Sequence, residues 1–247
     1  MPGGPGGTGG AGLIAGPLDF VAFDFDGTLT DYVQADLDAL ETLRRHACPH
    51  TEEQTFAARA VDEIMAFHDR VEAGKSDPLD MNAERLTRTL AAHSVTCTAA
   101  HLQLYAEALI HGTRPAPGVT ALLTALRRRG LRLALLSNAY DGPAQRARID
   151  ACFPDRPFEV IVVAGEGATL KPDPQPFRLM LAQLGQSADR GVYVGDSPEH
   201  DVAGAVAAGL RAVLVHPHPR VQQRGSRLGA AQAVSSLDAL AGLLARD

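Results

Sequence analysis

Two carboxylates separated by one residue, Asp24 and Asp26, stand at the end of a short apolar run that begins at Phe20. This run, closed by Gly27, is typical of a buried strand that ends in a turn. If the strand stayed extended, period-two alternation would place both carboxylates on one side of it. Carboxylates crowded at a buried strand end repel each other unless a cation lies between them or one is protonated. A plain turn is the competing interpretation, because Asp-Gly-Thr is common turn chemistry.

Other polar residues also follow apolar runs that predict strands. Ser137 and Asn138 follow one run, and Asp196 follows another after Gly195. The carboxyl ends of parallel strands form the crevice where ligands bind. The sequence therefore predicts that these side chains gather with Asp24 at one edge of a sheet.

Lys171 stands out by composition. It and Lys75 are the only lysines among 23 basic residues, so arginine fills almost every other basic position. A lysine kept within Lys-Pro-Asp-Pro at 171–174 indicates a role for a compact ammonium rather than a planar guanidinium.

The elements that must position these residues fall into two parts. Residues 31–114 carry apolar residues at helical spacing and no strand signal, which predicts an inserted bundle of helices. From Ala116 onward, helical and strand patterns alternate, as in a parallel sheet with helical crossovers. The expected strands are 20–23, 131–136, 160–163, 192–194 and 212–215. The expected helices are 33–47, 51–74, 82–93, 98–111, 118–129, 143–151, 174–185, 199–208 and 236–244.

Bulk properties exclude several classes of protein. The net charge of −6 over 247 residues argues against nucleic acid or an anionic membrane as a partner. The three cysteines are scattered and form no Cys-x-x-Cys pair, which favours reduced thiols and a cytoplasmic protein. Residues 1–17 are mostly Gly and Pro and predict a disordered tail rather than a signal peptide. No apolar stretch approaches the length of a membrane span.

Four segments stand out in chain order: Asp24-Phe-Asp26-Gly-Thr28, Leu-Ser137-Asn138, Lys171-Pro-Asp173-Pro and Gly195-Asp196-Ser-Pro-Glu-His-Asp201. Together they resemble the motifs of the haloacid dehalogenase-like (HAD) hydrolase superfamily, in its helical-cap (subfamily I) phosphatase type. The resemblance covers residues 18–30 and roughly 116–245. It implies an α/β fold: a doubly wound, Rossmann-like parallel sheet of five strands in the order 5-4-1-2-3. It also implies a core of residues 18–30 and 116–247 and an all-helical cap domain of residues 31–115.

The resemblance also implies catalytic roles. Asp24 would be the nucleophile that becomes an aspartyl phosphate, and Asp26 would protonate the leaving oxygen and then deprotonate the attacking water. Lys171 and the Ser137 hydroxyl would contact the phosphate, with Asn138 beside them. Thr28 is expected to orient Asp26, and it also counts among the candidate phosphate contacts.

A Mg²⁺ ion is the implied cofactor. Asp24, Asp196 and the main-chain carbonyl of Asp26 would hold it, because Mg²⁺ prefers a few carboxylate oxygens plus substrate oxygen and water. Asp201 has three open interpretations: a direct ligand, a residue that orients the metal's waters, or a plain helix-start carboxylate.

The expected function is a Mg²⁺-dependent phosphatase acting on a small phosphate ester such as a sugar phosphate, phosphoglycolate or a nucleotide. Asp26 favours this reaction, because the dehalogenases of the family do not carry Asp at that position. A sugar phosphomutase and a non-catalytic phosphate-binding regulatory protein remain as alternatives. The His216-Pro-His218-Pro segment resembles a metal site but is more typical of a proline-rich loop.

Overall fold

Six strands form one parallel sheet in the order β3-β2-β1-β4-β5-β6 in the computed structural model. The structure describes residues 17–77 and 80–244, so residues 1–16 of the expected tail lie outside the described residues. The order confirms the predicted arrangement of the first five strands, with β1 between β2 and β4. The strands are β1 (Phe20–Phe23), β2 (Arg132–Asn138), β3 (Val160–Ala164), β4 (Gly191–Gly195), β5 (Arg211–Val215) and β6 (Gln232–Val234).

The predicted count of five strands is wrong by one, because β6 adds an edge strand beside β5. Its three residues, Gln-Ala-Val, are too few to show the alternation that marks a strand in a sequence. The helix before it, α9 (Pro219–Arg227), is also absent from the prediction. It is mostly polar and buries only Gly225, so it lacks an apolar stripe.

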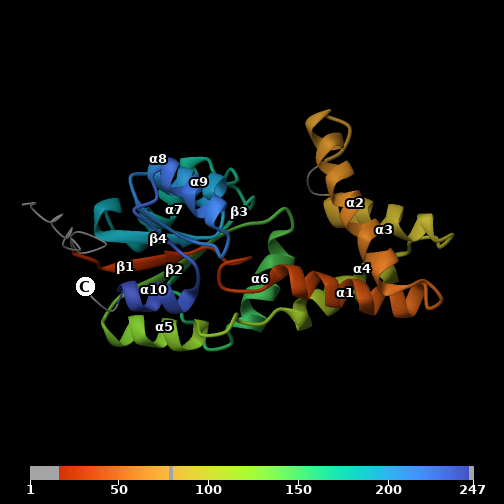
Figure 1. The fold of residues 1–247 in the computed structure, drawn as a ribbon, viewed down its shortest axis with the longest axis horizontal. Coiled ribbons are helices and arrows are strands. Elements are labelled where there is room, and N and C mark those ends of the chain that lie inside the picture. Colours follow the sequence, from red (N-terminus) through yellow and green to blue (C-terminus); the bar gives the residue numbers. More distant parts are fainter. Residues whose placement is uncertain (1–16, 78–79, 245–247) are drawn as a thin grey trace, which may run out of the picture.

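Successive residues of the central strand, β1, point alternately into two hydrophobic cores on opposite faces of the sheet. Val21 and Phe23 of β1 pack on one face with α5 (Val119–Arg128) and α10 (Leu237–Leu244). Phe20 and Ala22 pack on the other face with α7 (Pro174–Leu184). All four strand residues are buried, as expected for a strand covered by helices on both sides. Figure 1 shows these helices on opposite sides of the sheet.

Among the described residues, four α-helices lie between β1 and α5 and build a third hydrophobic cluster of their own. We call residues 31–115 the helical segment; its status as a separate domain stays a prediction. Inside it, Arg85 is fully buried and pairs with Asp36 on both carboxylate oxygens, at 2.7 and 2.9 Å. Figure 1 shows these helices beyond one end of the sheet. They are α1 (Tyr32–Ala47), α2 (Glu53–Glu72), α3 (Met81–Ala92) and α4 (Ala99–Gly112).

The two linkers of the helical segment lie side by side. Thr30 forms an antiparallel bridge with Pro115, and the Ala116 amide donates to the Leu29 carbonyl at 2.8 Å. The helical segment is therefore connected to the sheet by two linkers that lie next to each other, close to the end of β1.

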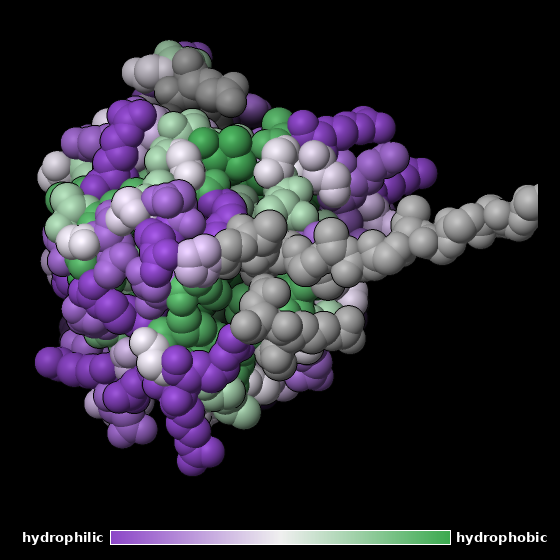
Figure 2. All heavy atoms as spheres, turned by 90° about the vertical axis from the view of Figure 1, so that its left-hand side faces the viewer, coloured by the Kyte–Doolittle hydropathy of each residue, from purple (hydrophilic) through white to green (hydrophobic). Residues whose placement is uncertain are grey.

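Figure 2 looks at the end of the molecule that faces away from the helical segment, where hydrophilic side chains cover much of the surface and apolar ones show between them. Among the described helices, none combines the length and the hydropathy needed to cross a membrane.

Candidate active site

The predicted functional residues converge at the carboxyl ends of the central strands. Asp24 follows β1, Ser137 lies near the end of β2, and Asp196 follows β4. Lys171 reaches the same place from the loop between β3 and α7, and Asp201 from the π-helical turn Pro198–Ala203. The chain runs from β1 to β2 and β3 on one side of β1 and then crosses from β3 to β4 on its other side, so this is a topological switch point where open sheets bind ligands.

Asp24 is buried and held on both carboxylate oxygens. Its Oδ1 accepts a hydrogen bond from Lys171 Nζ at 2.6 Å, and its Oδ2 accepts one from Thr28 Oγ1 at 3.2 Å. Burial raises the pKa of Asp24 well above its ordinary value; Lys171 opposes this, whereas Asp201 and Asp196 add to it. The site therefore holds more negative charge than its lysine neutralises.

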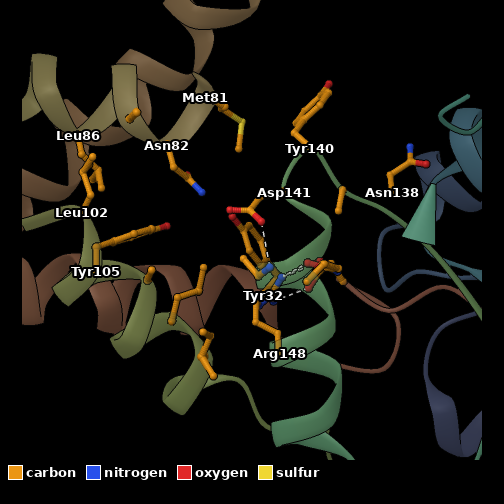
Figure 3. A pocket seen from close by; sticks show the side chains of 18 of the residues that line it. Tyr32, Met81, Asn82, Leu86, Leu102, Tyr105, Asn138, Tyr140, Asp141 and Arg148 are labelled. Atoms are coloured by element: carbon orange, nitrogen blue, oxygen red, sulfur yellow. Dashed lines mark hydrogen bonds and ion pairs between the residues drawn. The ribbon is translucent and has the colours of Figure 1, made fainter. Parts of the chain in front are cut away.

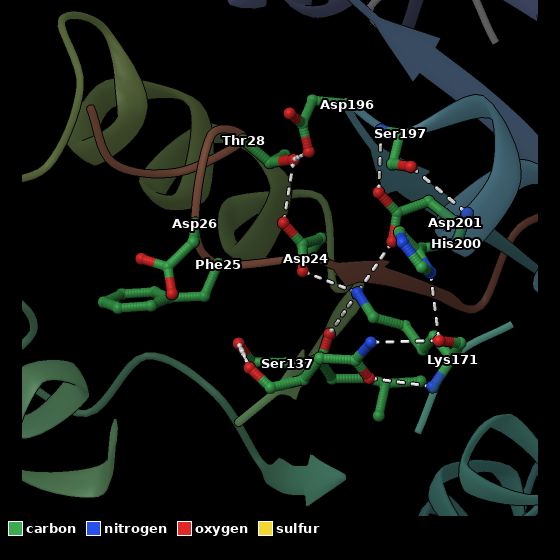
Figure 4. A network of polar contacts seen from close by, with 12 residues as sticks. Asp24, Phe25, Asp26, Thr28, Ser137, Lys171, Asp196, Ser197, His200 and Asp201 are labelled. Carbon is green, nitrogen blue, oxygen red and sulfur yellow. Dashed lines mark hydrogen bonds and ion pairs between the residues drawn. The ribbon is translucent and has the colours of Figure 1, made fainter. Parts of the chain in front are cut away.

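Lys171 lies between two carboxylates (Figure 4). Its Nζ is 2.6 Å from Asp24, 2.7 Å from Asp201 and 3.0 Å from the Tyr193 hydroxyl. Burial would lower the pKa of Lys171, but the charges of Asp201 and Asp24 outweigh it and raise that pKa well above its ordinary value. Lys171 is therefore a fixed ammonium, and not a proton donor near neutral pH.

Asn138 holds the main chain of Lys171 in place. Its Oδ1 accepts from the Lys171 amide at 2.8 Å, and its Nδ2 donates to the Lys171 carbonyl at 3.0 Å. The Nδ1 atom of His200 lies 3.0 Å from the same carbonyl. Both polar groups of the Asn138 side chain are thus engaged with Lys171, and a contact of Asn138 with phosphate stays a prediction.

Asp201 uses both carboxylate oxygens within the protein. Its Oδ1 accepts from Lys171 and lies 3.3 Å from the Tyr193 hydroxyl, while Oδ2 accepts from the Ser197 amide at 2.9 Å. These contacts favour a role for Asp201 in placing Lys171 over direct metal ligation.

The Asp196 carboxylate has fewer hydrogen bonds than the carboxylates of Asp24 and Asp201. Its one side-chain partner among the described residues is the Thr28 hydroxyl at 3.4 Å. Burial raises the pKa of Asp196 to about 6, with the charge of Asp201 adding to the effect and Lys171 opposing it. Gly27 lies against this carboxylate with φ of +83°, and a Cβ there would come within 2.5 Å of Asp196 Oδ2. Glycine is required at 27 both for the turn and for the approach of Asp196.

These carboxylates fit a divalent cation. One oxygen each from Asp24, Asp196 and Asp201 lies within 4.8 Å of the others. The excess negative charge and the donor set of carboxylate oxygens match the preference of Mg²⁺ for hard ligands. Asp24 and Asp196 each keep an oxygen whose hydrogen-bond partner is the Thr28 hydroxyl. The two oxygens of Asp201 instead accept from Lys171 and from the Ser197 amide, so Asp24 and Asp196 are the better candidate ligands.

Asp26 points away from Asp24 (Figure 4). Arg148 from α6 (Gly142–Cys152) pairs with both of its carboxylate oxygens, at 2.6 and 3.0 Å, and Gln145 Nε2 donates at 2.8 Å. The expectation that the two carboxylates share one side of an extended strand does not hold, because β1 ends at Phe23 and the chain turns.

Thr28 does not contact Asp26, so the expected orienting role is wrong. Its hydroxyl faces Asp24 and Asp196, whereas the Thr30 hydroxyl lies 3.4 Å from Asp26. Ser137 is buried and accepts a hydrogen bond from Gln145 Nε2 at 2.9 Å. Its hydroxyl lies 3.4 Å from the Asn138 carbonyl, and its contact with phosphate stays a prediction.

Sequence reasoning missed three residues of the site: Gln145, Arg148 and Tyr193. Arg148 is one arginine among many, on a helix with no distinctive pattern. Tyr193 lies within an apolar strand and looks like an ordinary core residue. The roles of all three depend on contacts between distant parts of the chain, which spacing alone does not reveal.

A cavity of about 510 Å³ lies between this site and the helical segment (Figure 3). Asp26, Asn138 and Lys171 line its sheet end, and residues of α3 and α4 line its other end. A phosphate held near Lys171 would therefore direct the rest of its molecule toward the helical segment.

Comparison with known proteins agrees with this architecture. The family model described as "haloacid dehalogenase-like hydrolase" matches residues 18–209. A phosphoglycolate phosphatase from Rhodospirillum rubrum is 36% identical over 202 residues, covering 79% of this chain and 78% of its own. A phosphoserine phosphatase from Thermus thermophilus is 40% identical over 99 residues, covering 40% of this chain and 39% of its own.

Solved structures share the fold. The magnesium-bound HAD-hydrolase YfnB from Bacillus subtilis superposes with a TM-score of 0.75 at 20% identity, covering 93% of this chain and 99% of its own. The L-2-haloacid dehalogenase from Xanthobacter autotrophicus gives a TM-score of 0.68 at 18% identity, covering 92% of this chain and 98% of its own.

Proposed function

The chain belongs to the haloacid dehalogenase-like hydrolase family, and from that membership and the site we infer that it is a phosphatase that hydrolyses a small phosphorylated metabolite. Two similar proteins carry the names phosphoglycolate phosphatase and phosphoserine phosphatase, and both names denote hydrolases of small phosphate monoesters. The observation that carries the proposal is the placement of Asp24, buried at a strand end with Lys171 Nζ 2.6 Å from its carboxylate.

We propose that Asp24 is the nucleophile. One oxygen of its carboxylate attacks phosphorus, the bond between phosphorus and the ester oxygen breaks, and the leaving oxygen takes a proton from Asp26. A water molecule then attacks phosphorus in the aspartyl phosphate and gives a proton to Asp26. The acyl phosphate bond breaks, which releases inorganic phosphate and restores Asp24.

Lys171 supports the attack by charge. Its ammonium contacts Asp24 and lies at the sheet end of the cavity, where it would also face phosphate oxygens. Asn138 and Asp201 keep the ammonium at this point through the main chain and the side chain of Lys171. The Ser137 hydroxyl, close to the same strand end, is the proposed donor to a phosphate oxygen.

The proposed cofactor is Mg²⁺, held by Asp24 and Asp196 together with the main-chain carbonyl of Asp26. When bound, it supplies positive charge that offsets the repulsion between a carboxylate nucleophile and an anionic phosphate. The pKa values of Asp24 and Asp196 are raised mainly by burial, with neighbouring carboxylates adding to the effect, and a bound cation would favour the charged form of both.

We further propose that residues 31–115 form a cap domain on a core of residues 18–30 and 116–247. The adjacent linkers at Thr30 and Pro115 support this, since two neighbouring attachment points allow hinge motion. A cytoplasmic location is part of the proposal, supported by Cys48, Cys97 and Cys152 all being free thiols.

Phosphate release from p-nitrophenyl phosphate tests the proposed function. We expect Mg²⁺-dependent turnover by the natural sequence and a loss of at least about 10³-fold in Asp24→Asn, which keeps the size of the side chain but removes the attacking charge. Asp19→Asn is the matched control, because Asp19 pairs with Arg190 away from the site. Turnover that survives in Asp24→Asn, or that is absent from the natural sequence, would contradict the proposal.

A further inference from the structure

The cavity beside the site has an apolar wall on the side of the helical segment. Leu86, Leu102, Leu109 and Ile110 line it from α3 and α4. These residues belong to the part of the cavity that the leaving group would occupy while phosphate lies near Lys171. An apolar wall stabilises an apolar surface of the leaving group.

The Arg and Lys side chains that line the cavity are already paired, and the Nδ1 atom of His200, which also lines it, lies 3.0 Å from the Lys171 carbonyl. Arg148 is bound on both prongs by Asp26, and Lys171 lies between Asp24 and Asp201. Asp141 adds a further carboxylate to the lining. Within the described lining, a leaving group that carries its own carboxylate therefore finds no free Arg or Lys side chain to pair with, and an unpaired buried charge is costly.

The remaining lining offers ring surfaces and a neutral hydrogen-bonding group. Tyr32, Tyr105 and Tyr140 contribute aromatic rings, and the Tyr105 hydroxyl is occupied by Asp36. The amide of Asn82 extends into the cavity (Figure 3), and its oxygen is buried with no hydrogen-bond partner among the described residues. Asn82 thus presents a neutral amide to whatever fills the cavity.

The size of the cavity also favours a larger leaving group. Its volume of about 510 Å³ lies within the range typical of small-molecule sites, about 300–1,000 Å³. A two-carbon acid would leave most of the apolar wall without a partner.

We propose that the preferred substrates are phosphate monoesters whose leaving group is an uncharged ring compound with apolar faces and a hydrogen-bonding edge, such as a nucleoside. Leaving groups that carry a carboxylate are disfavoured. This inference rests on the proposed phosphatase function and deepens it, because it assigns the substrate class of the same site.

Matched pairs of esters that differ by one carboxylate test the inference. We expect kcat/KM to be at least about tenfold higher for phenyl phosphate than for 4-carboxyphenyl phosphate, and for ethyl phosphate than for phosphoglycolate. Uridine 5′-monophosphate is likewise expected to exceed ribose 5-phosphate by about tenfold or more. Equal values within the pairs, or a preference for the carboxylates, would overturn the inference while leaving the phosphatase function intact. Absence of phosphate release from every ester, p-nitrophenyl phosphate included, would overturn both.

A charge added to the apolar wall gives a second test. Leu102→Arg places a free cation in the cavity, and we expect the discrimination against the carboxylate esters to fall by about tenfold. Gln103→Arg is the matched control, because it adds the same charge to an exposed position of the same helix. A fall of equal size in both variants would mean that long-range attraction, and not the cavity wall, sets the preference, and it would overturn the inference.

Discussion

The carboxylate of Asp26 and the guanidinium of Arg148 face each other in a two-pronged ion pair, with contacts of 2.6 and 3.0 Å. Both oxygens of the Asp26 carboxylate accept from Arg148, so one of them has to be freed before Asp26 acts on a leaving oxygen, while the other stays paired with Arg148. Arg148 also donates from Nε to Thr113 Oγ1 at 3.1 Å and lies 4.9 Å from the centre of the Tyr32 ring. Through these contacts it touches the first residue of α1 and the residue that follows α4, at the two ends of the helical segment.

Because Arg148 fixes the position of the Asp26 carboxylate, replacing Arg148 by Met should impair proton transfer to the leaving group more than the attack of Asp24. An alkyl phosphate needs an acid for its poor leaving group, whereas p-nitrophenyl phosphate hardly does. We expect kcat/KM to fall at least about tenfold more for the alkyl ester than for p-nitrophenyl phosphate. This difference is part of the ~10²–10⁴-fold rate enhancement that general acid catalysis contributes.

Arg146→Met is the control for that experiment, because Arg146 lies on the same helix and pairs with Glu166 at the surface. Arg146→Met should leave kcat/KM unchanged for both esters. Equal losses for the two esters in Arg148→Met would show that Arg148 supports the structure alone.

Lys171→Arg should lose at least about 100-fold in kcat while the protein stays folded. The ammonium is buried and contacts acceptors at 2.6 and 2.7 Å, and a larger planar guanidinium cannot take the same position. Steady-state kinetics and circular dichroism check this. Lys75→Arg, the same change at the chain's other lysine, should have no effect, and a loss below about tenfold in Lys171→Arg would mean that the lysine merely neutralises its neighbours.

Removal of divalent metal should abolish turnover, and added Mg²⁺ should restore it. Ca²⁺ should restore it poorly, since it favours more ligands at longer distances. A binding readout independent of turnover is thermal unfolding: Mg²⁺ should raise the Tm of the natural sequence and not that of Asp196→Asn, because ligands stabilise the state that they bind. An equal rise in both proteins would exclude Asp196 as a ligand.

The buried pair of Arg85 and Asp36 predicts a stability effect inside the helical segment. Arg85→Met leaves the carboxylate of Asp36 buried without its cation, which should lower the free energy of unfolding by about 3–5 kcal/mol in urea titrations. Arg88→Met, at a half-exposed position of the same helix, should change it by less than about 0.5 kcal/mol. Similar small losses in both would contradict the buried pair.

Local pattern was enough to predict where most elements lie. The apolar runs at β1, β2 and β4 each end at a polar residue that the structure brings to the same edge, because parallel strands place their carboxyl ends together. The sixth strand and α9 escaped prediction because one is three residues long and the other lacks an apolar stripe.

The orientation of individual side chains was harder to predict. Asp26 turns toward α6 because Arg148, far away in the sequence, provides a two-pronged partner there. Thr28 contacts Asp24 and Asp196 because the turn at Gly27 redirects the chain. Such details depend on tertiary contacts and a backbone turn, and neither follows from the spacing of motifs.

The central claim, that Asp24 carries the phosphoryl group, is tested most directly by trapping the intermediate. The enzyme is mixed with substrate and Mg²⁺, quenched in acid and treated with borohydride, which reduces an acyl phosphate to the alcohol. Peptide mass spectrometry should then find homoserine at position 24 in the natural sequence. With p-nitrophenyl phosphate as substrate, the intermediate should accumulate in Asp26→Asn, because this leaving group hardly needs an acid whereas the attacking water still needs a base. An unmodified Asp24 under conditions of active turnover, or a reduced carboxylate at another position, would contradict the account.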